Sequence, residues 1–457
     1  MNHLGIEMNP VNIPVLDSAF IPVHKFNEAF LETAGQPFGV ALTRGEDQVA
    51  VCNTFVHGTP HMRAADFCYL EHLIKTLLWM KGGYLLELCG DEVLCRHLEK
   101  MYAPDGARAF DFNFMSRVFE RPFAVRRVDR LPEARSVSVS VGRHLEGCRI
   151  GFDAGGSDRK VSAVIDGTPV FSEEVVWHPK LNADPAYHYE GIVSAFRSAA
   201  AHMPRVDAIG VSSAGIFINN RTMMASLFLK VPEPLFYAQV QDIYLRAARE
   251  IGNVPVVVAN DGDVTALAGA MSLGENNVLG IAMGTSEAGG YVDGAGNITG
   301  WLNELAFIPV DLNPAAMRDE WSGDIGCGVK YFSQDAVIKL AEQAKIDLSE
   351  GRAPAEKLKI VQRLAEQGDA DALQVYDDIG VYLGHSLPFY HTLYGFTNVL
   401  LLGRVMSGTG GERLYETAVR VLNEEYPEIA SAVTLRLPDE KSRRVGQSVA
   451  AASLPEL

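Results

Sequence analysis

The sequence predicts an α/β protein that contains a duplicated unit of strands and helices. Three stretches carry this prediction: a valine-rich run over 254–259 that ends at Asn260-Asp261, and two glycine-rich turns, at 154–157 and 284–290, each between two strand-like runs. A continuous run of β-branched residues indicates a strand buried on both faces, as in a parallel sheet. The two similar turns indicate that one structural element occurs twice.

Composition limits the classes of protein that the chain can belong to. It has 457 residues, enough for two or three domains, and its 47% hydrophobic and 21% charged residues are those of an ordinary globular protein. The net charge of −17 and the lack of a basic run argue against nucleic-acid binding. We find no signal-peptide pattern and no apolar run of about 20 residues, so we expect a cytoplasmic protein without a membrane partner.

The cysteines and histidines do not form a recognisable metal motif. The six cysteines include no CxxC pair, so neither a zinc knuckle nor a redox motif is indicated. We expect Cys89 and Cys95 to lie in a strand and a helix of one core. His57 and His61 have a spacing compatible with metal ligation, but without an evident third ligand we interpret them as solvated loop residues.

Residues 1–147 predict a first α/β region in which we find no chemical motif. The predicted elements are a hairpin over 38–42 and 48–52, a helix over 65–80 ended by Gly82-Gly83, a buried strand over 84–90, and a helix over 92–102 capped by Asp91. The region is either a small domain or an elaboration of a larger one. Residues 131–135 are typical of a linker.

The stretch 149–167 predicts two strands joined by a glycine turn and followed by an Asp-Gly hairpin turn. Gly155 and Gly156 allow backbone N–H groups to approach a phosphate without interference from a Cβ atom. Ser157 adds a hydroxyl donor, and Asp153 at the strand end is suited to hold Mg²⁺ through water. The same residues are also compatible with an ordinary turn.

The chain then leads to the valine-rich strand. The predicted elements are a helix over 186–202, a strand over 208–213 and a helix over 235–251. Open α/β sheets bind ligands at strand carboxyl ends, where a carboxylate can take a proton from a bound hydroxyl, which makes Asp261 a candidate general base. The alternative is an Asp-Gly turn in which Asp263 caps the next helix. Ser213 is either a substrate contact or part of a plain turn.

The stretch 278–294 repeats the strand, glycine turn, strand and Asp-Gly turn. Glu304 follows and is either an acceptor for ligand hydroxyls or a solvated loop carboxylate. The remaining predicted elements are a helix over 333–345, a polar, solvated helix over 348–368, a helix over 369–394 and a strand over 399–405. The last glycine loop, 408–411, either lies flat against a purine or begins the helix over 412–422.

In this order, the motifs resemble those of the sugar kinases of the actin/hexokinase superfamily. The chain is most similar to the ROK family (repressors, open reading frames and kinases), over roughly residues 147–452. The resemblance implies a two-lobed ribonuclease H-like (actin-like ATPase) fold, with lobes at 148–270 and 271–457 after the N-terminal α/β region 1–147. It also implies an ATP-dependent kinase that uses Mg²⁺ and phosphorylates a hydroxyl of a sugar or sugar derivative.

The resemblance assigns roles residue by residue. Asp261 is similar to the family's general base, and Asn260 and Glu304 are similar to its sugar-binding residues; we add Ser213 as a candidate substrate contact. The nucleotide-binding residues implied are Asp153, Gly155, Gly156, Ser157, Gly284, Thr285, Gly289, Gly290, Gly403, Gly408 and Gly410. Of these, Asp153 is expected to hold Mg²⁺ through water.

Three positions depart from the family pattern. Phe307 replaces a His that binds sugar or zinc, Val329 replaces a further sugar-binding Glu, and Cys327 is all that is left of a cysteine-rich zinc loop. We therefore expect no structural zinc and a substrate other than glucose, or a changed sugar site.

Three further functions stay open at this point. One is an acyl or acid kinase of the same superfamily, or an ATPase, although the Asn260-Asp261 pair favours a hydroxyl acceptor. A ROK-type transcriptional regulator would carry a basic helix-turn-helix, and the acidic chain and the pattern of residues 1–147 argue against it. A catalytically weak ROK-like sugar-sensing or regulatory protein is suggested by Phe307 and Val329. We expect a homodimer whose partners are a sugar and ATP.

Overall fold

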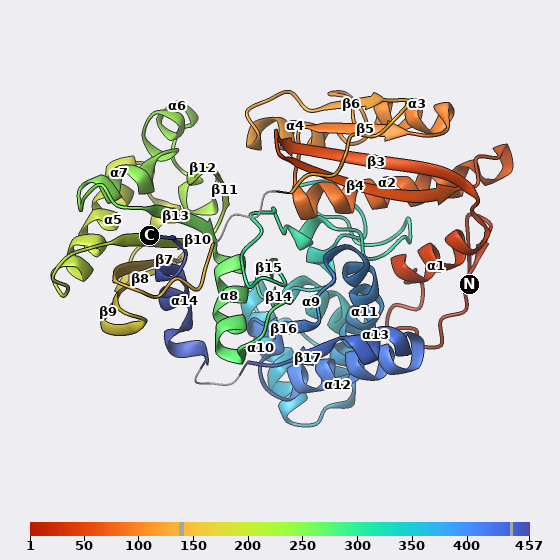
Figure 1. The fold of residues 1–457 in the computed structure, drawn as a ribbon. Helices are drawn as coiled ribbons and strands as arrows, with labels where there is room; N and C mark the ends of the chain where they lie inside the picture. Colours follow the sequence, from red (N-terminus) through yellow and green to blue (C-terminus); the bar gives the residue numbers. More distant parts are fainter. Residues whose placement is uncertain (137–140, 439–441) are drawn as a thin grey trace. The chain divides into compact units, whose positions relative to one another are not determined.

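The computed structural model of the chain describes residues 1–136, 141–438 and 442–457 (Figure 1). The chain forms two compact units. Unit 1 comprises Met1–Val137, Ile281–Gly289 and Trp301–Arg436, and unit 2 comprises Ser138–Gly280, Gly290–Gly300 and Leu437–Leu457. The three-part division at residues 147 and 270 stays a prediction. In the described ranges, no helix combines the length and the apolar character that crossing a membrane requires.

Unit 2 is built on a five-stranded sheet in the order β13-β10-β7-β8-β9. The strands are β7 (Cys148–Ala154), β8 (Asp158–Ile165), β9 (Thr168–Val176), β10 (Ala208–Ser213) and β13 (Val256–Asn260). β7, β10 and β13 are parallel, whereas β7, β8 and β9 form an antiparallel meander. Asp166 and Gly167, both at positive φ, make the predicted β8–β9 turn. This is the strand order of a ribonuclease H-like sheet, so the predicted fold class is confirmed.

Helices cover this sheet, and two strand glycines let one of them approach closely. The helices are α5 (Pro185–Ala200), α6 (Glu233–Leu235), α7 (Ile243–Arg249), α8 (Asp261–Leu273) and α14 (Ser442–Ala452), and β11 (Ile216–Ile218) pairs with β12 (Arg221–Met224). A Cβ atom on Gly151 or Gly210 would lie 1.8 or 1.6 Å from a carbonyl oxygen of α14. Only glycine therefore allows α14 to pack on β7 and β10.

The prediction of one continuous helix over 235–251 is wrong. A π-helical turn covers Phe236–Val240, and α7 begins only at Ile243. The carbonyl oxygen of Gln241 accepts the N–H of Thr222 in β12 (2.8 Å), so it bonds to the β11–β12 pair and does not continue a helix. A tertiary hydrogen bond thus interrupts a pattern that is helical by its local sequence.

Unit 1 includes a second sheet in the order β15-β14-β16-β17. Its elements are β14 (Val278–Met283), β15 (Glu287–Val292), β16 (Asn398–Leu402) and β17 (Thr434–Arg436), with helices α9 (Gln334–Gln343), α10 (Pro354–Glu366), α11 (Ala370–Tyr394), α12 (Gly408–Glu425) and α13 (Pro427–Ala432). The unit boundary falls within β14 and β15. In this sheet the hairpin β14–β15 is followed by β16 and β17, so the order β15-β14-β16-β17 corresponds to β8-β7-β10-β13 in unit 2. This correspondence confirms the duplication. The helix predicted over 348–368 corresponds to the shorter α10. We predicted a solvated helix, but α10 is amphipathic, because it buries Leu358, Val361 and Ala365.

The N-terminal region belongs to unit 1 and carries its own sheet, in the order β4-β3-β5-β6. Its elements are β1 (Asn2–His3), β2 (Ile6–Glu7), α1 (Val23–Thr33), β3 (Gln36–Gly45), β4 (Gln48–Val56), α2 (Arg63–Lys81), β5 (Leu85–Cys89), α3 (Glu92–Met101), α4 (Ala109–Val118) and β6 (Ala124–Arg127). The predicted hairpin, helices and strand are confirmed. Asp91 caps α3 by accepting the N–H groups of Val93 and Leu94 (2.9 and 3.0 Å).

We predicted that His57 is a solvated loop residue, but its side chain does not lie free in solvent. Its backbone N–H donates to Asp66 Oδ1 (2.8 Å), and its ring lies 3.2 Å from the same oxygen and 2.9 Å from the Thr33 hydroxyl. His61 is exposed. The described residues contain no group of three or more His, Cys, Asp or Glu side chains arranged to hold a metal ion.

Candidate functional site

β13 ends at Asn260, and this side chain caps the following helix. Asn260 Oδ1 accepts the N–H of Gly262 (2.7 Å), and its Nδ2 donates to the Gly215 carbonyl (2.8 Å). The alternative that Asp263 caps α8 is wrong, because Asp263 lies inside the first turn and accepts the N–H of Tyr291 (3.1 Å). The amide of Asn260 therefore fixes the strand end on which Asp261 lies.

Asp261 is the first residue of α8, at the carboxyl edge of the unit 2 sheet. Its Oδ1 accepts the N–H of Gly262 (3.0 Å). Burial raises the pKa of Asp261 above its ordinary value, while hydrogen bonds to backbone N–H groups and the charge of Lys180 oppose this shift. A carboxylate with a raised pKa accepts a proton more readily near neutral pH.

Asp153 lies near the end of β7, in register with Ser212 of β10. The Ser212 hydroxyl donates to Asp153 Oδ1 (2.9 Å) and accepts from the Gln447 amide (3.1 Å). Burial raises the pKa of Asp153 to about 6, and the nearby charge of Asp261 adds to the shift. Two carboxylates that repel each other at one sheet edge, one of them with a pKa near 6, are a donor set that fits Mg²⁺.

The first glycine turn, Gly155–Ser157, connects β7 and β8 beside these carboxylates. The Trp177 indole N–H donates to the Gly155 carbonyl (2.8 Å) and holds the turn. A Cβ on Gly156 would lie 3.3 Å from the exposed Lys180 ammonium, so this cation lies over the turn. Ser157 donates its hydroxyl proton to Asp158 (3.0 Å). Sequence reasoning missed Lys180, since only the fold brings it next to the turn.

If the first glycine turn binds the phosphates of ATP, as the sequence predicts, Lys180→Met should raise the KM for ATP about tenfold, because the variant removes the ammonium group beside this turn. Initial rates at varied ATP concentration measure this, with Lys230→Met, an exposed lysine of the same unit, as the matched control. An unchanged KM for ATP in Lys180→Met would exclude this lysine from the nucleotide site.

The second glycine turn brings three predicted nucleotide-binding residues together: Gly284, Thr285 and Gly403. The Thr285 hydroxyl accepts from the exposed guanidinium of Arg404 (2.9 Å). Gly403 has a φ of +95°, and a Cβ there would lie 2.2 Å from the carbonyl oxygen of Met283, just before Gly284. Arg404 is a second cation that the sequence analysis missed.

Three of the glycines predicted to bind nucleotide lie in close packing contacts within the protein. Gly289 and Gly290 lie inside β15 and not in the turn, and a Cβ on them would lie 2.6 Å from the Asn303 carbonyl oxygen and 2.1 Å from the Gly262 carbonyl oxygen. Gly410 lies in α12, where a Cβ would lie 2.4 Å from the Tyr376 ring. The loop 408–411 is thus the start of a helix, the alternative left open; Gly408 and Thr409 are exposed, whereas Gly410 and Gly411 are buried.

The predicted sugar-binding residues differ in their availability. Glu304 is partly exposed, and its backbone N–H donates to the Trp79 carbonyl (3.1 Å). Ser213 is fully buried, and its hydroxyl accepts from Tyr244 (2.8 Å), which commits it to the core of unit 2. Phe307 is 7% exposed and packs on Trp79, with 4.3 Å between ring centroids.

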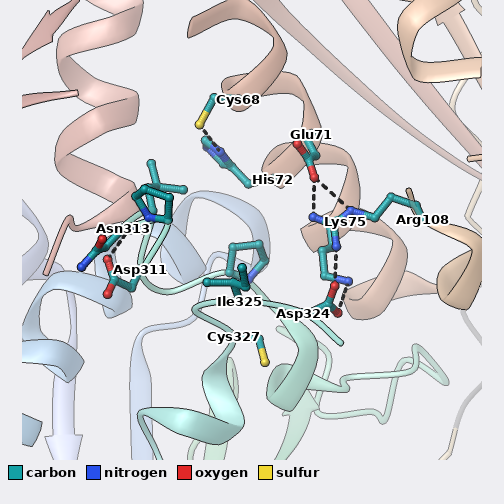
Figure 2. Close-up of a pocket in the computed structure, with 13 residues that line it drawn as sticks. Cys68, Glu71, His72, Lys75, Arg108, Asp311, Asn313, Asp324, Ile325 and Cys327 are labelled. Atoms are coloured by element: carbon teal, nitrogen blue, oxygen red, sulfur yellow. Dashed lines mark hydrogen bonds and ion pairs between the residues drawn. The ribbon is translucent and has the colours of Figure 1, made fainter. Parts of the chain in front are cut away.

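A separate pocket of about 300 Å³ lies in unit 1 between α2 and the 309–327 stretch (Figure 2). Its lining includes Cys68, His72, Pro309 and Cys327, but none of the predicted site residues. Four charged groups of its lining, Glu71, Lys75, Arg108 and Asp324, form ion pairs with one another, whereas Asp311 accepts hydrogen bonds from the Ile21 N–H and the Tyr331 hydroxyl (2.8 and 2.6 Å).

Comparisons with known proteins agree with this fold. The sequence model of the ROK family matches residues 149–443. A ROK hexokinase from Thermus thermophilus is 22% identical, with a TM-score of 0.51, over 67% of this chain and 97% of that one. A ROK family glucokinase from Streptomyces griseus, in complex with glucose and AMPPNP, is 21% identical (TM-score 0.48; 67% and 98%), and a ROK family transcriptional regulator, a homolog of the E. coli MLC protein, is 18% identical (0.49; 68% and 79%). No curated protein matches the chain.

Proposed function

The chain belongs to the ROK family, and on that premise we propose that it is an ATP-dependent kinase that phosphorylates a hydroxyl of a sugar or sugar derivative. One observation carries the proposal: the carboxylates of Asp153 and Asp261 lie at the carboxyl edge of the unit 2 sheet, and burial raises both pKa values. Open α/β sheets bind ligands at this edge.

In the proposed reaction, Asp261 takes the proton of a sugar hydroxyl while the hydroxyl oxygen forms a bond to the γ-phosphorus of ATP and the bond from that phosphorus to ADP breaks. Asp153 would hold Mg²⁺ through water, and this ion would neutralise part of the phosphate charge. The N–H groups of Gly155 and Gly156, with Lys180, orient the phosphates. Phosphoryl transfer depends chiefly on positioning and electrostatic stabilisation, so these residues suffice for a catalytic role.

A second candidate is a sugar-binding regulatory protein with weak or no turnover. The packing of Phe307 on Trp79 favours it, because no imidazole is present where the family resemblance implies one. Asp261 at the strand end favours the kinase, since a protein that only binds sugar needs no base there.

We expect ADP release from ATP and Mg²⁺ in the presence of at least one member of a panel of hexoses, N-acetylhexosamines and polyols. A coupled assay for ADP measures it, and reactions without sugar are the control for ATP hydrolysis. Sugar binding by calorimetry without ADP formation would instead support the regulatory candidate. We also propose that the protein is a homodimer and that it is cytoplasmic. Light scattering tests the first proposal, and cell fractionation tests the second.

A further inference from the structure

The 301–327 segment of unit 1 carries Glu304 but has little regular structure of its own. Apart from the short 3-10 helix Leu305–Phe307, it consists of turns, bends and isolated bridges. Its internal hydrogen bonds close turns or join isolated bridges, for example from the Val310 N–H to the Gly326 carbonyl (2.8 Å), and apart from the 3-10 helix they form no continuous ladder. Its conformation therefore depends on the elements that pack against it.

Helix α2 makes the first attachment through its last turn. The N–H groups of Asn303 and Glu304 donate to the carbonyl oxygens of Met80 and Trp79 (3.0 and 3.1 Å). The last carbonyl groups of a helix lack intrahelical partners, so the end of α2 and the backbone at Glu304 satisfy each other. Asn303 has a φ of +51°, a conformation that needs such support.

An aromatic cluster makes the second attachment. The Phe307 ring packs on Trp79 of α2, and Trp321 lies 5.4 Å from Phe307 and 5.2 Å from Phe110 of α4, measured between ring centroids. The Trp79 indole N–H donates to Asp111 of α4 (2.8 Å), which fixes the ring. Phe307 thus packs on α2, and Trp321 packs on α4.

Ion pairs make the third attachment (Figure 2). Arg108, directly before α4, pairs with Glu71 of α2 and with Asp324 of the segment. Lys75 of α2, whose side chain is 2% exposed, lies 2.7 Å from Asp324 and 3.1 Å from Asp111. Removal of one member of such a buried network leaves a charge without compensation, so the network resists any movement of the segment.

We propose that α2 and α4 are the positioning element for Glu304, and that Arg108 and Trp79 act on sugar binding through the 301–327 segment without touching the sugar. The inference rests on the proposed function, because it treats Glu304 as a sugar ligand. The proposal assigns a function to α2 and α4, which lie before residue 149 and therefore outside the match to the ROK family.

Arg108→Met tests the proposal. We expect the KM for the sugar to rise about tenfold while kcat and the KM for ATP change less than twofold, because a mobile segment presents Glu304 for only part of the time. Hydrogen exchange at the amides of Asn303 and Glu304 is expected to accelerate about tenfold. Arg108→Lys, which keeps one charge but not the forked geometry, is expected to lie between wild type and Arg108→Met.

Arg96→Met, which breaks the exposed Arg96–Glu92 pair on α3, is the matched control and should change none of these quantities. Faster exchange with an unchanged KM for the sugar would overturn the inference, and so would unchanged exchange. If Arg108→Met does not fold, Asp324→Asn tests the same contact. A wild-type protein without sugar-dependent ADP release would contradict the proposed function, whereas the exchange comparison would still report whether α2 and α4 hold the segment.

Discussion

Asp261→Asn is expected to lower the rate of sugar-dependent ADP release by about three orders of magnitude, the typical contribution of a general base. Asparagine keeps the shape of the side chain and can still lie beside the Gly262 N–H group, but it cannot accept the proton of the attacking hydroxyl. The KM for the sugar should change by less than about threefold, because Asn260 and Glu304 are unaltered. Steady-state kinetics of the purified variant measure both quantities.

The control for this experiment is Asp242→Asn, which removes an exposed carboxylate of the same unit. Circular dichroism and the Tm of both variants should match those of the wild type. Near-native turnover in Asp261→Asn would show that another group takes the proton, and the proposed mechanism would then be wrong.

Glu287→Gln is expected to stabilise the protein above neutral pH. Glu287 lies in β15, is 3% exposed, and neither of its carboxyl oxygens has a hydrogen-bond partner among the described residues. Burial raises the pKa of Glu287 well above its ordinary value, and the charge of Glu304 adds to the shift. The charge of Glu287 in turn contributes to the raised pKa of Tyr390 and of Cys327.

The direction of the pH dependence follows from these pKa values. Between the ordinary pKa of 4.5 and the raised pKa of the folded state, the unfolded chain loses a proton that the folded protein keeps. The free energy of unfolding of the wild type therefore falls as the pH rises through this range, by up to about 1.4 kcal/mol per pH unit. Glutamine does not titrate, so the stability of Glu287→Gln lacks this decline.

Urea denaturation of the wild type and Glu287→Gln at pH 5, 7 and 8 measures the difference, which should increase with pH. Glu412→Gln, which removes an exposed carboxylate from α12 in the same unit, should show no such trend. A constant difference across this pH range would mean that Glu287 has an ordinary pKa in the folded protein.

Much of the fold could be predicted from local patterns. Hydrophobic periodicity located α2 and α11 within one or two residues, and the Asp-Gly dipeptide located the turn at Asp166 and Gly167. The helix predicted over 235–251 failed because the carbonyl of Gln241 bonds to a residue of β12, a contact that periodicity does not contain.

The candidate site divides in a similar way. The position of Asp261 at a strand end follows from the apolar run that stops at Asn260, and the structure has both residues there. The close packing at Gly289 and Gly410 could not be predicted, because a glycine that admits a phosphate and one that admits a neighbouring backbone or ring look the same in a sequence.

By itself, the sequence determined the kinds of elements, the duplicated hairpins and the strand-end place of Asp261. Each of these depends on side-chain period, glycine conformation or capping within a few neighbouring residues. Only the tertiary structure decided that Lys180 lies over the first turn, that Arg404 binds Thr285, and that α2 holds the backbone at Glu304. Those contacts join residues far apart in the chain, and their partners are selected by packing, on which the local pattern carries no information.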